Sequence, residues 1–174
     1  EGNIINVYQQ LNNVYDQQYM EHKDQDGYYN AFRGLMDRSL NDEVYSAISV
    51  RAHNNEYFFS KAPLLKMLDY SRSMGISVWT ELQYLQFLKA KDEARFNDIH
   101  WSDNRLIFMI NSSLSHQRGI TCLIPYTYNG KKITEIASNG TSQPYVVKSV
   151  KGFDYAWVTV KPGSAYNMEV SYAD

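Results

Sequence analysis

The sequence is poor in cysteine, in proline and in long apolar runs. Its 174 residues include one cysteine and four prolines, so an internal disulfide or a thiolate metal cluster is excluded. No apolar run approaches the roughly 20 residues that span a bilayer, so we expect no membrane partner. Acidic and basic residues are mixed along the chain, with a formal net charge of −2. This distribution argues against a nucleic-acid partner.

Apolar and aromatic side chains are abundant. Hydrophobic residues make up 44% of the chain, which suffices for a buried core in one domain or two small ones. Fifteen tyrosines, seven phenylalanines and three tryptophans are the unusual feature of the composition. Such rings suit contacts with sugars or proteins. The more common explanation is that most of them occupy half-buried strand and helix positions.

The beginning of the chain has a helical pattern. Residues 3–20 carry apolar side chains at a 3.6-residue period, which predicts an amphipathic helix. We therefore expect no signal peptide in this sequence, and the first residue, Glu1, indicates a processed or excised chain. A second helix is predicted over Ala31–Leu40. A third is predicted to begin at Ser60 as its N-cap, with Pro63 in the first turn.

Two short strands are predicted between and after these helices. Val44–Ala52 is compact and β-branched, which indicates a buried strand, and Ile76–Trp79 indicates another. Thr80 and Gln83 match a capping box that opens a further helix. Its inward-facing side chains are predicted to be Leu82, Leu85 and Leu88. Because helices and strands alternate as in parallel βα units, we assign residues 1–97 to a partial, barrel-like α/β segment.

Short strands and turns replace this pattern after residue 97. Six or seven strand-forming runs follow one another up to Tyr172, and Cys122 lies inside one of them as a predicted buried residue. Asn129-Gly130 and Asn139-Gly140 are hairpin signals. Residues 98–174 are therefore predicted to form a small antiparallel, Ig-like β-sandwich, which makes the whole chain α+β.

His53 is the strongest candidate for chemistry. It lies just past the C-terminal end of the strand predicted over Val44–Ala52. In α/β folds, ligand-binding and catalytic groups collect at that end. Imidazole titrates near neutral pH, so a histidine there can act as a general acid or base. The more common alternative is a histidine that is hydrogen-bonded in an ordinary loop.

Trp79 is the best candidate for a substrate-binding ring, because it ends a predicted strand on the same rim as His53. Core packing is the more common role, and it is also favoured for Trp101 and Trp157, which lie in strand contexts. The segment 22–27 contains an Asp-x-Asp-Gly run but lacks the later ligands of a calcium loop, so a solvated loop is predicted. We find no sequence motif for a metal site, a nucleophile elbow or a phosphate-binding loop.

Several runs, in this order, resemble the last part of NodB-type polysaccharide deacetylases. Large secreted relatives in that family carry a β-sandwich after the barrel. The runs that carry the resemblance are Asn6–Gln10, Tyr45–Ile48, Val50–His53, Gly75–Glu81, Leu85–Phe87, Asn129–Lys131 and Val150–Ala156.

The resemblance implies a distorted (β/α) barrel that hydrolyses acetyl groups from sugar polymers. In the complete family enzyme an Asp-His-His set binds a divalent metal, with zinc as the expected ion, and an aspartate acts as the base. A late histidine protonates the leaving group, and only this last motif has a match here, with His53 as the candidate general acid. Ala52 stands where the family usually has a bulkier aliphatic residue, which puts the acetyl pocket in doubt.

The earlier family motifs, Thr-Phe-Asp-Asp, His-x-x-x-His and Arg-x-Pro-Tyr, are absent from the sequence. The resemblance therefore implies the C-terminal portion of a secreted or periplasmic enzyme, with no cofactor bound by this chain and no activity alone. Its expected ligand is a polysaccharide or other glycan. The alternatives are that the sandwich is a glycan-binding accessory module or a purely structural one. Because two parallel strands alone leave unpaired edges, we also expect self-association or binding to the upstream part of the same protein.

Overall fold

The computed structural model describes residues 13–42, 44–111, 119–160 and 165–174. Helices account for 36% and strands for 39% of the structure, which confirms the α+β class. The chain divides into two compact units, an N-terminal unit (Glu1–Trp79) and a C-terminal unit (Thr80–Asp174). This boundary precedes the one expected at residue 97, because helix α4 (Glu81–Glu93) groups with the strands that follow it.

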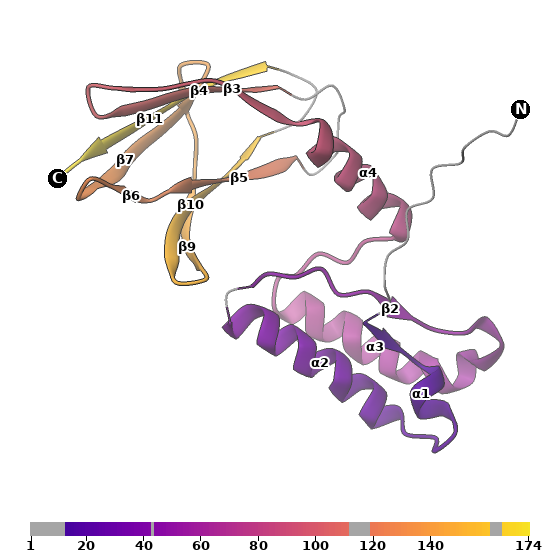
Figure 1. Cartoon of the computed structure of the whole chain (residues 1–174). Helices are drawn as coiled ribbons and strands as arrows, with labels where there is room; N and C mark the ends of the chain where they lie inside the picture. Colours follow the sequence, from indigo (N-terminus) through magenta and orange to yellow (C-terminus); the bar gives the residue numbers. More distant parts are fainter. Residues whose placement is uncertain (1–12, 43, 112–118, 161–164) are drawn as a thin grey trace, which may run out of the picture. The chain divides into compact units, whose positions relative to one another are not determined.

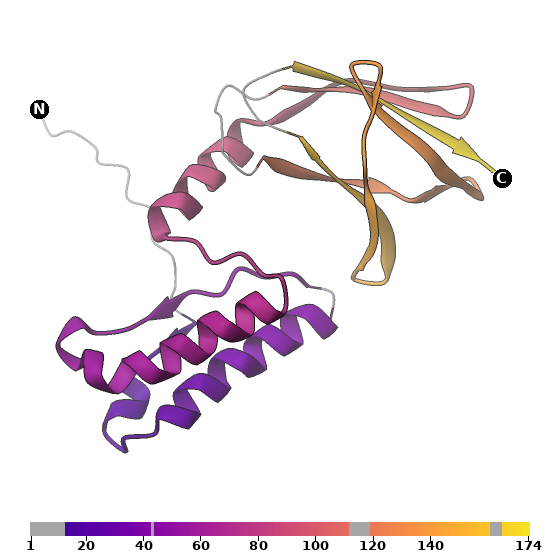
Figure 2. The same ribbon diagram turned by 180° about the vertical axis from the view of Figure 1, so that it is seen from behind.

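The N-terminal unit combines a parallel strand pair with two long helices (Figure 1). Its elements, in chain order, are β1 (Val14–Tyr15), α1 (Gln17–Met20), α2 (Gln25–Asn41), β2 (Val50–Arg51), the 3₁₀ helix η1 (Asn54–Glu56) and α3 (Tyr57–Ser73). Helices α2 and α3 lie side by side in both views (Figures 1 and 2). The two strands are parallel, with Val14 opposite Val50. This pair joins the predicted strand region at Val50–Arg51 to a segment predicted to be helical, and not to Ile76–Trp79.

Spacing along α2 explains why this helix packs against the rest of the unit. Asp24 caps its N-terminus by accepting a hydrogen bond from the Gly27 backbone N–H at 2.8 Å. Buried residues then recur every three or four positions along one face, as in an amphipathic helix. The buried residues of the apolar cluster in this unit are Val14, Tyr28, Phe32, Met36 and Met67.

Three elements of this unit differ from the prediction. Residues 3–12 of the predicted first helix lie outside the described residues, but Val14–Tyr15 is a strand. Its backbone pairs with Ser49 and Arg51, and this distant pairing overrides the local helical pattern. The strand predicted over Val44–Ala52 is reduced to Val50–Arg51. The strand predicted over Ile76–Trp79 is wrong, because that segment forms no regular structure.

Two predictions about helix ends and faces are also corrected. Ser60 is not the N-cap of α3, because the helix begins three residues earlier, at Tyr57. Ser60 lies inside the helix and is completely buried. Leu82 of α4 is exposed rather than inward-facing, while Ala90 is the buried residue of that helix. The predicted capping box is confirmed, since Thr80 and Gln83 exchange hydrogen bonds at the start of α4.

The C-terminal unit contains two antiparallel sheets. After α4 its strands are β3 (Arg95–Ser102), β4 (Arg105–Asn111), β5 (Ile120–Pro125), β6 (Thr127–Tyr128), β7 (Lys131–Ser138), β8 (Thr141–Ser142), β9 (Val146–Val150), β10 (Phe153–Val160) and β11 (Ala165–Ala173). One sheet has the order β5-β10-β9. The other has the order β3-β4-β11-β7-β6, with β8 also paired to β7. Both sheets contribute to one core, so the predicted sandwich is present, and its Ig-like character stays a prediction.

The larger sheet curls until its two outer strands meet. β3 and β6 are the first and last strands in its order. Nevertheless, the rings of Trp101 on β3 and Tyr128 on β6 have centroids only 4.5 Å apart. The buried Tyr172 of β11 lies 5.1 Å from Trp101 and donates its hydroxyl to the Pro125 carbonyl. Aromatic packing therefore closes this side of the sandwich.

Both predicted Asn-Gly turns are confirmed. Asn129 and Asn139 have φ angles of 50° and 48°, and each is followed by a glycine with positive φ. Two consecutive residues with positive φ give the backbone twist that matches antiparallel strands. No helix in the described part of the chain is long and apolar enough to cross a membrane.

Two glycines provide opposite tests of the backbone. Gly119 has φ +75°, and a Cβ atom there would lie 2.6 Å from the Val160 carbonyl oxygen. Gly119→Ala is therefore expected to lower the free energy of unfolding by about 2 kcal/mol or more. Gly34 lies inside α2, and a Cβ atom there would meet no other atom within 4 Å, so Gly34→Ala should raise stability by roughly 0.5–1 kcal/mol. Urea denaturation of both variants checks the pair, and equal effects would contradict the expectation.

Candidate functional site

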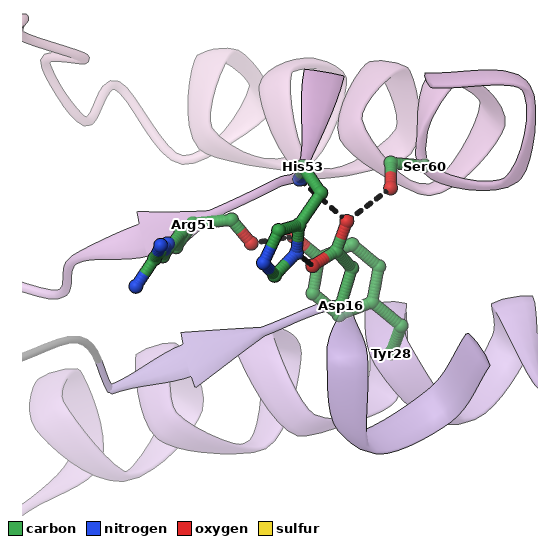
Figure 3. A network of polar contacts seen from close by, with 5 residues as sticks. All are labelled: Asp16, Tyr28, Arg51, His53 and Ser60. Carbon is green, nitrogen blue, oxygen red and sulfur yellow. Dashed lines mark hydrogen bonds and ion pairs between the residues drawn. The ribbon is translucent and has the colours of Figure 1, made fainter. Parts of the chain in front are cut away.

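A polar network lies where the two parallel strands end. Asp16 directly follows β1, and His53 lies just beyond the C-terminal end of β2. Because the strands are parallel and in register, their C-terminal ends are adjacent. Ser60 reaches the same place from the first turn of α3, as Figure 3 shows. The network therefore joins three segments that are distant in the sequence.

Asp16 is the centre of this network. Its Oδ1 atom lies 2.6 Å from Nδ1 of His53. Its Oδ2 atom accepts two hydrogen bonds, from the His53 backbone N–H and from the Ser60 hydroxyl, both at 2.7 Å. Asp16 is 0% exposed, whereas the His53 side chain is 30% exposed. The carboxylate is thus enclosed, while the imidazole reaches the surface.

Tyr28 supports the strand end on which the network is built. Its side chain is fully buried, and its hydroxyl donates a hydrogen bond to the Arg51 carbonyl at 2.8 Å. The same carbonyl accepts the backbone N–H of Asp16 at 3.2 Å. Burial, and then the negative charge of Asp16, raise the pKa of Tyr28 well above its ordinary value. The hydroxyl therefore remains a neutral donor to Arg51.

The pKa of Asp16 reflects two opposing effects. Burial on its own raises the pKa of the carboxyl, because it penalises the charged form. The hydrogen bonds from the His53 backbone, the His53 ring and the Ser60 hydroxyl favour the charged form and outweigh burial. The pKa of Asp16 consequently lies below its usual value, and the group is a carboxylate at neutral pH.

An ionised Asp16 determines which ring nitrogen of His53 can react. A carboxylate only accepts hydrogen bonds, so Nδ1 must carry a proton in this pair. The second nitrogen, Nε2, points away from Asp16 in Figure 3, and none of the described residues forms a hydrogen bond with it. Nε2 is therefore the atom that can exchange a proton with a bound molecule.

The donor set at this site does not fit a divalent metal ion. Both oxygens of Asp16 already accept hydrogen bonds from N–H and O–H donors, and Nδ1 of His53 faces the carboxylate. Only Nε2 would be left as a ligand, whereas a zinc site uses at least three protein ligands and Mg²⁺ prefers oxygen ligands. The described residues contain no group of three or more histidine, cysteine or acidic side chains that could hold a metal.

No family model, no curated protein and no solved structure matches this chain. The resemblance to NodB-type deacetylases therefore stays a prediction that depends on the sequence runs alone. The contact between His53, the predicted site residue, and the buried Asp16 carboxylate is a feature of this structure and does not depend on any relative.

The sequence pattern does not identify three residues of this network, Asp16, Ser60 and Tyr28. It places Asp16 in the interior of a predicted helix. Had the strand at Val14–Tyr15 been predicted, an aspartate directly after it would have been a candidate, because ligand-binding groups collect at the ends of parallel strands. Trp79 is half-buried in the irregular segment after α3, so it does not end a strand on the rim of His53. The prediction that Trp79 contacts substrate depended on that strand, so the structure gives it no support.

Proposed function

We propose that Asp16 and His53 form the general-acid part of a hydrolytic site that acts on an acetylated polysaccharide. The single observation that carries this proposal is the buried Asp16 carboxylate bound to Nδ1 of a partly exposed histidine, whose other nitrogen points away from that carboxylate. A carboxylate in this position fixes the orientation and the tautomer of the imidazole. A histidine held only by a surface loop would have no such constraint.

The proposed step is a proton transfer from Nε2. When His53 is an imidazolium, Nδ1–H remains bound to Asp16. Nε2–H, on the side of the ring away from Asp16, is then the proton available to a substrate. As the acetyl–nitrogen or acetyl–oxygen bond of the tetrahedral intermediate breaks, Nε2 donates its proton to the leaving amine or alkoxide. The released sugar is then neutral at that atom, acetate is the other product, and His53 recovers a proton from water.

The choice of an acetylated glycan as substrate comes from the resemblance to NodB-type deacetylases. On this proposal the chain supplies the late catalytic histidine, and the metal-binding and base motifs precede Glu1 in the complete enzyme. The same resemblance supports a secreted or periplasmic location. The geometry of the Asp16–His53 pair supports the acid role of His53.

The test uses the protein at the full length that its gene encodes. Acetate release from acetylated oligosaccharides should fall by about 10²–10⁴-fold in kcat for His53→Ala, because general acid catalysis contributes that much. His100→Ala is the matched control, since His100 is an exposed histidine on β3 outside the network. Acetate release that is unchanged in His53→Ala, or that is absent with every acetylated polymer, would contradict the proposal.

The tryptophans of the C-terminal unit favour a structural role for the sandwich. The Lys148 ammonium lies over the Trp157 ring, 5.0 Å from its centroid. Trp101 contacts Tyr128 and Tyr172 at tilted angles of 50° and 54°. A flat row of exposed rings, which suits sugar stacking, is not formed by these residues.

A further inference from the structure

We propose that Ser60 is a positioning residue of the site, which holds the Asp16 carboxylate so that its Oδ1 atom meets Nδ1 of His53. This inference rests on the proposed function only in assuming that Nε2 of His53 is the reacting atom. Ser60 does not touch the substrate in this scheme and acts through Asp16. Helix α3 thereby becomes part of the site, although it carries none of its reacting atoms.

The distribution of hydrogen bonds on the carboxylate supports this role. Oδ2 is held by two donors and Oδ1 by one. Without the Ser60 hydroxyl, both remaining donors would come from His53 itself, through its backbone N–H and its ring. Among the described residues, no side-chain donor outside His53 would then hold the carboxylate, and the direction of Nε2 would be less constrained. Ser60 is the donor that anchors the pair to a separate element.

A second serine on the same helix shows what an ordinary buried helix serine does. Ser71 is 3% exposed, and its hydroxyl donates to the Met67 carbonyl four residues earlier, at 2.8 Å. This bond within the helix is the usual arrangement. Ser60 is 0% exposed, yet it donates to a side chain 44 residues away. Its hydroxyl therefore links α3 to the end of β1 rather than satisfying its own helix.

The position of Ser60 also suits a negative charge. It lies in the first turn of α3, where backbone N–H groups give the helix end a partial positive charge. The Asp16 carboxylate is bound at this end of the helix. A serine hydroxyl can donate there without introducing a second charge beside His53. Serine is therefore a suitable residue at this position, because it binds the buried Asp16 carboxylate and remains neutral.

The test compares Ser60→Ala with Ser71→Ala in this chain by NMR. Two signals are followed, the Nδ1-bound proton of His53 and the pH dependence of the Asp16 carboxyl carbon. In Ser60→Ala the Nδ1 proton should exchange with water fast enough to broaden, and the Asp16 midpoint should move to higher pH. Ser71→Ala should leave both signals as in the wild type. Unchanged signals in a folded Ser60→Ala protein would overturn the proposal.

A second variant covers the case in which Ser60→Ala does not fold. Ser60→Cys keeps a side chain of similar shape but replaces the hydroxyl with a weak donor. It should show the same two changes to a smaller degree, whereas wild-type signals would overturn the proposal. In the full-length protein, Ser60→Ala should lower kcat by roughly 10–100-fold with little change in KM.

The outcomes separate this inference from the proposed function. The NMR measurements need no substrate, so they report on positioning alone. If Ser60→Ala changes both signals but the full-length protein releases no acetate, the positioning role stands and the deacetylase proposal fails. If acetate release depends on His53 but Ser60→Ala leaves the NMR signals unchanged, the positioning role fails and the deacetylase proposal stands.

Discussion

Replacing Asp16 with asparagine is expected to lower the free energy of unfolding of the N-terminal unit by about 3 kcal/mol. Asp16 is fully buried and accepts three hydrogen bonds. Hydrogen bonds to a charged group each contribute about 1.5–3 kcal/mol. The asparagine amide has the same shape but carries no charge, so the hydrogen bonds that it accepts are weaker. Its NH₂ group would also face either the His53 ring, whose Nδ1 would then have to accept a hydrogen bond, or the two donors that now meet Oδ2. Urea denaturation combined with hydrogen exchange in α2 and α3 measures the loss.

Asp26→Asn provides the matched control for this substitution. Asp26 lies in the same unit and pairs with Lys66 at 2.9 Å, but both side chains are exposed. Exposed ion pairs contribute about 0–1 kcal/mol, so the control should change stability little. A cost for Asp26→Asn as large as that for Asp16→Asn would show that burial of the carboxylate is not the cause.

The difference between wild type and Asp16→Asn should also depend on pH. The folded-state pKa of Asp16 lies below its usual value, so folding releases protons from this group. The resulting stability is fully present above the unfolded pKa of about 4 and is lost as the pH falls below it. The two proteins should therefore differ most at neutral pH and converge in acid. A difference that is constant from pH 7 to pH 3 would contradict this linkage.

Ile136→Ala is expected to be the most destabilising single substitution in the sandwich, at about 3–4 kcal/mol. Ile136 is 0% exposed on β7 and pairs with Val170 of the neighbouring strand β11. Truncating a buried isoleucine removes apolar burial and leaves a cavity, which together cost about 2–5 kcal/mol. Thermal or urea denaturation of the C-terminal unit, followed by the exchange of β7 and β11 amides, measures the effect.

Ile99→Ala is the control in the same unit. Ile99 has the same side chain, also on a strand, but it is 63% exposed on β3. Its truncation opens no cavity, so we expect a change within about 0.5 kcal/mol. If both isoleucine variants lost the same stability, the assignment of Ile136 to the centre of the core would be wrong.

Features that depend on neighbouring residues can be predicted from the sequence. The capping box at Thr80 and Gln83 and the two Asn-Gly turns follow from short-range chemistry, and all three are present. The sandwich follows from repeated strand patterns between those turns. Of the parallel strand pair, only Val50–Arg51 is indicated by its own apolar run, and the strand is shorter than that run.

Features that depend on distant pairing could not be predicted in the same way. Val14–Tyr15 has a helical pattern but forms a strand, because it pairs with Val50–Arg51, a segment far along the chain. The site shows the same limit. His53 is recognisable from its place after a strand, whereas Asp16 and Ser60 acquire their roles only when β1, β2 and α3 come together.

The curled sheet of the C-terminal unit has a consequence for aggregation. Contact between Trp101 and Tyr128 brings β3 and β6 together, which makes these two strands poor templates for another chain. In the described part of the smaller sheet, β9 pairs only with β10 and exposes Val146 and Val147. Intermolecular strand addition, and the fibrils that can follow from it, would therefore start at β9 rather than at the larger sheet.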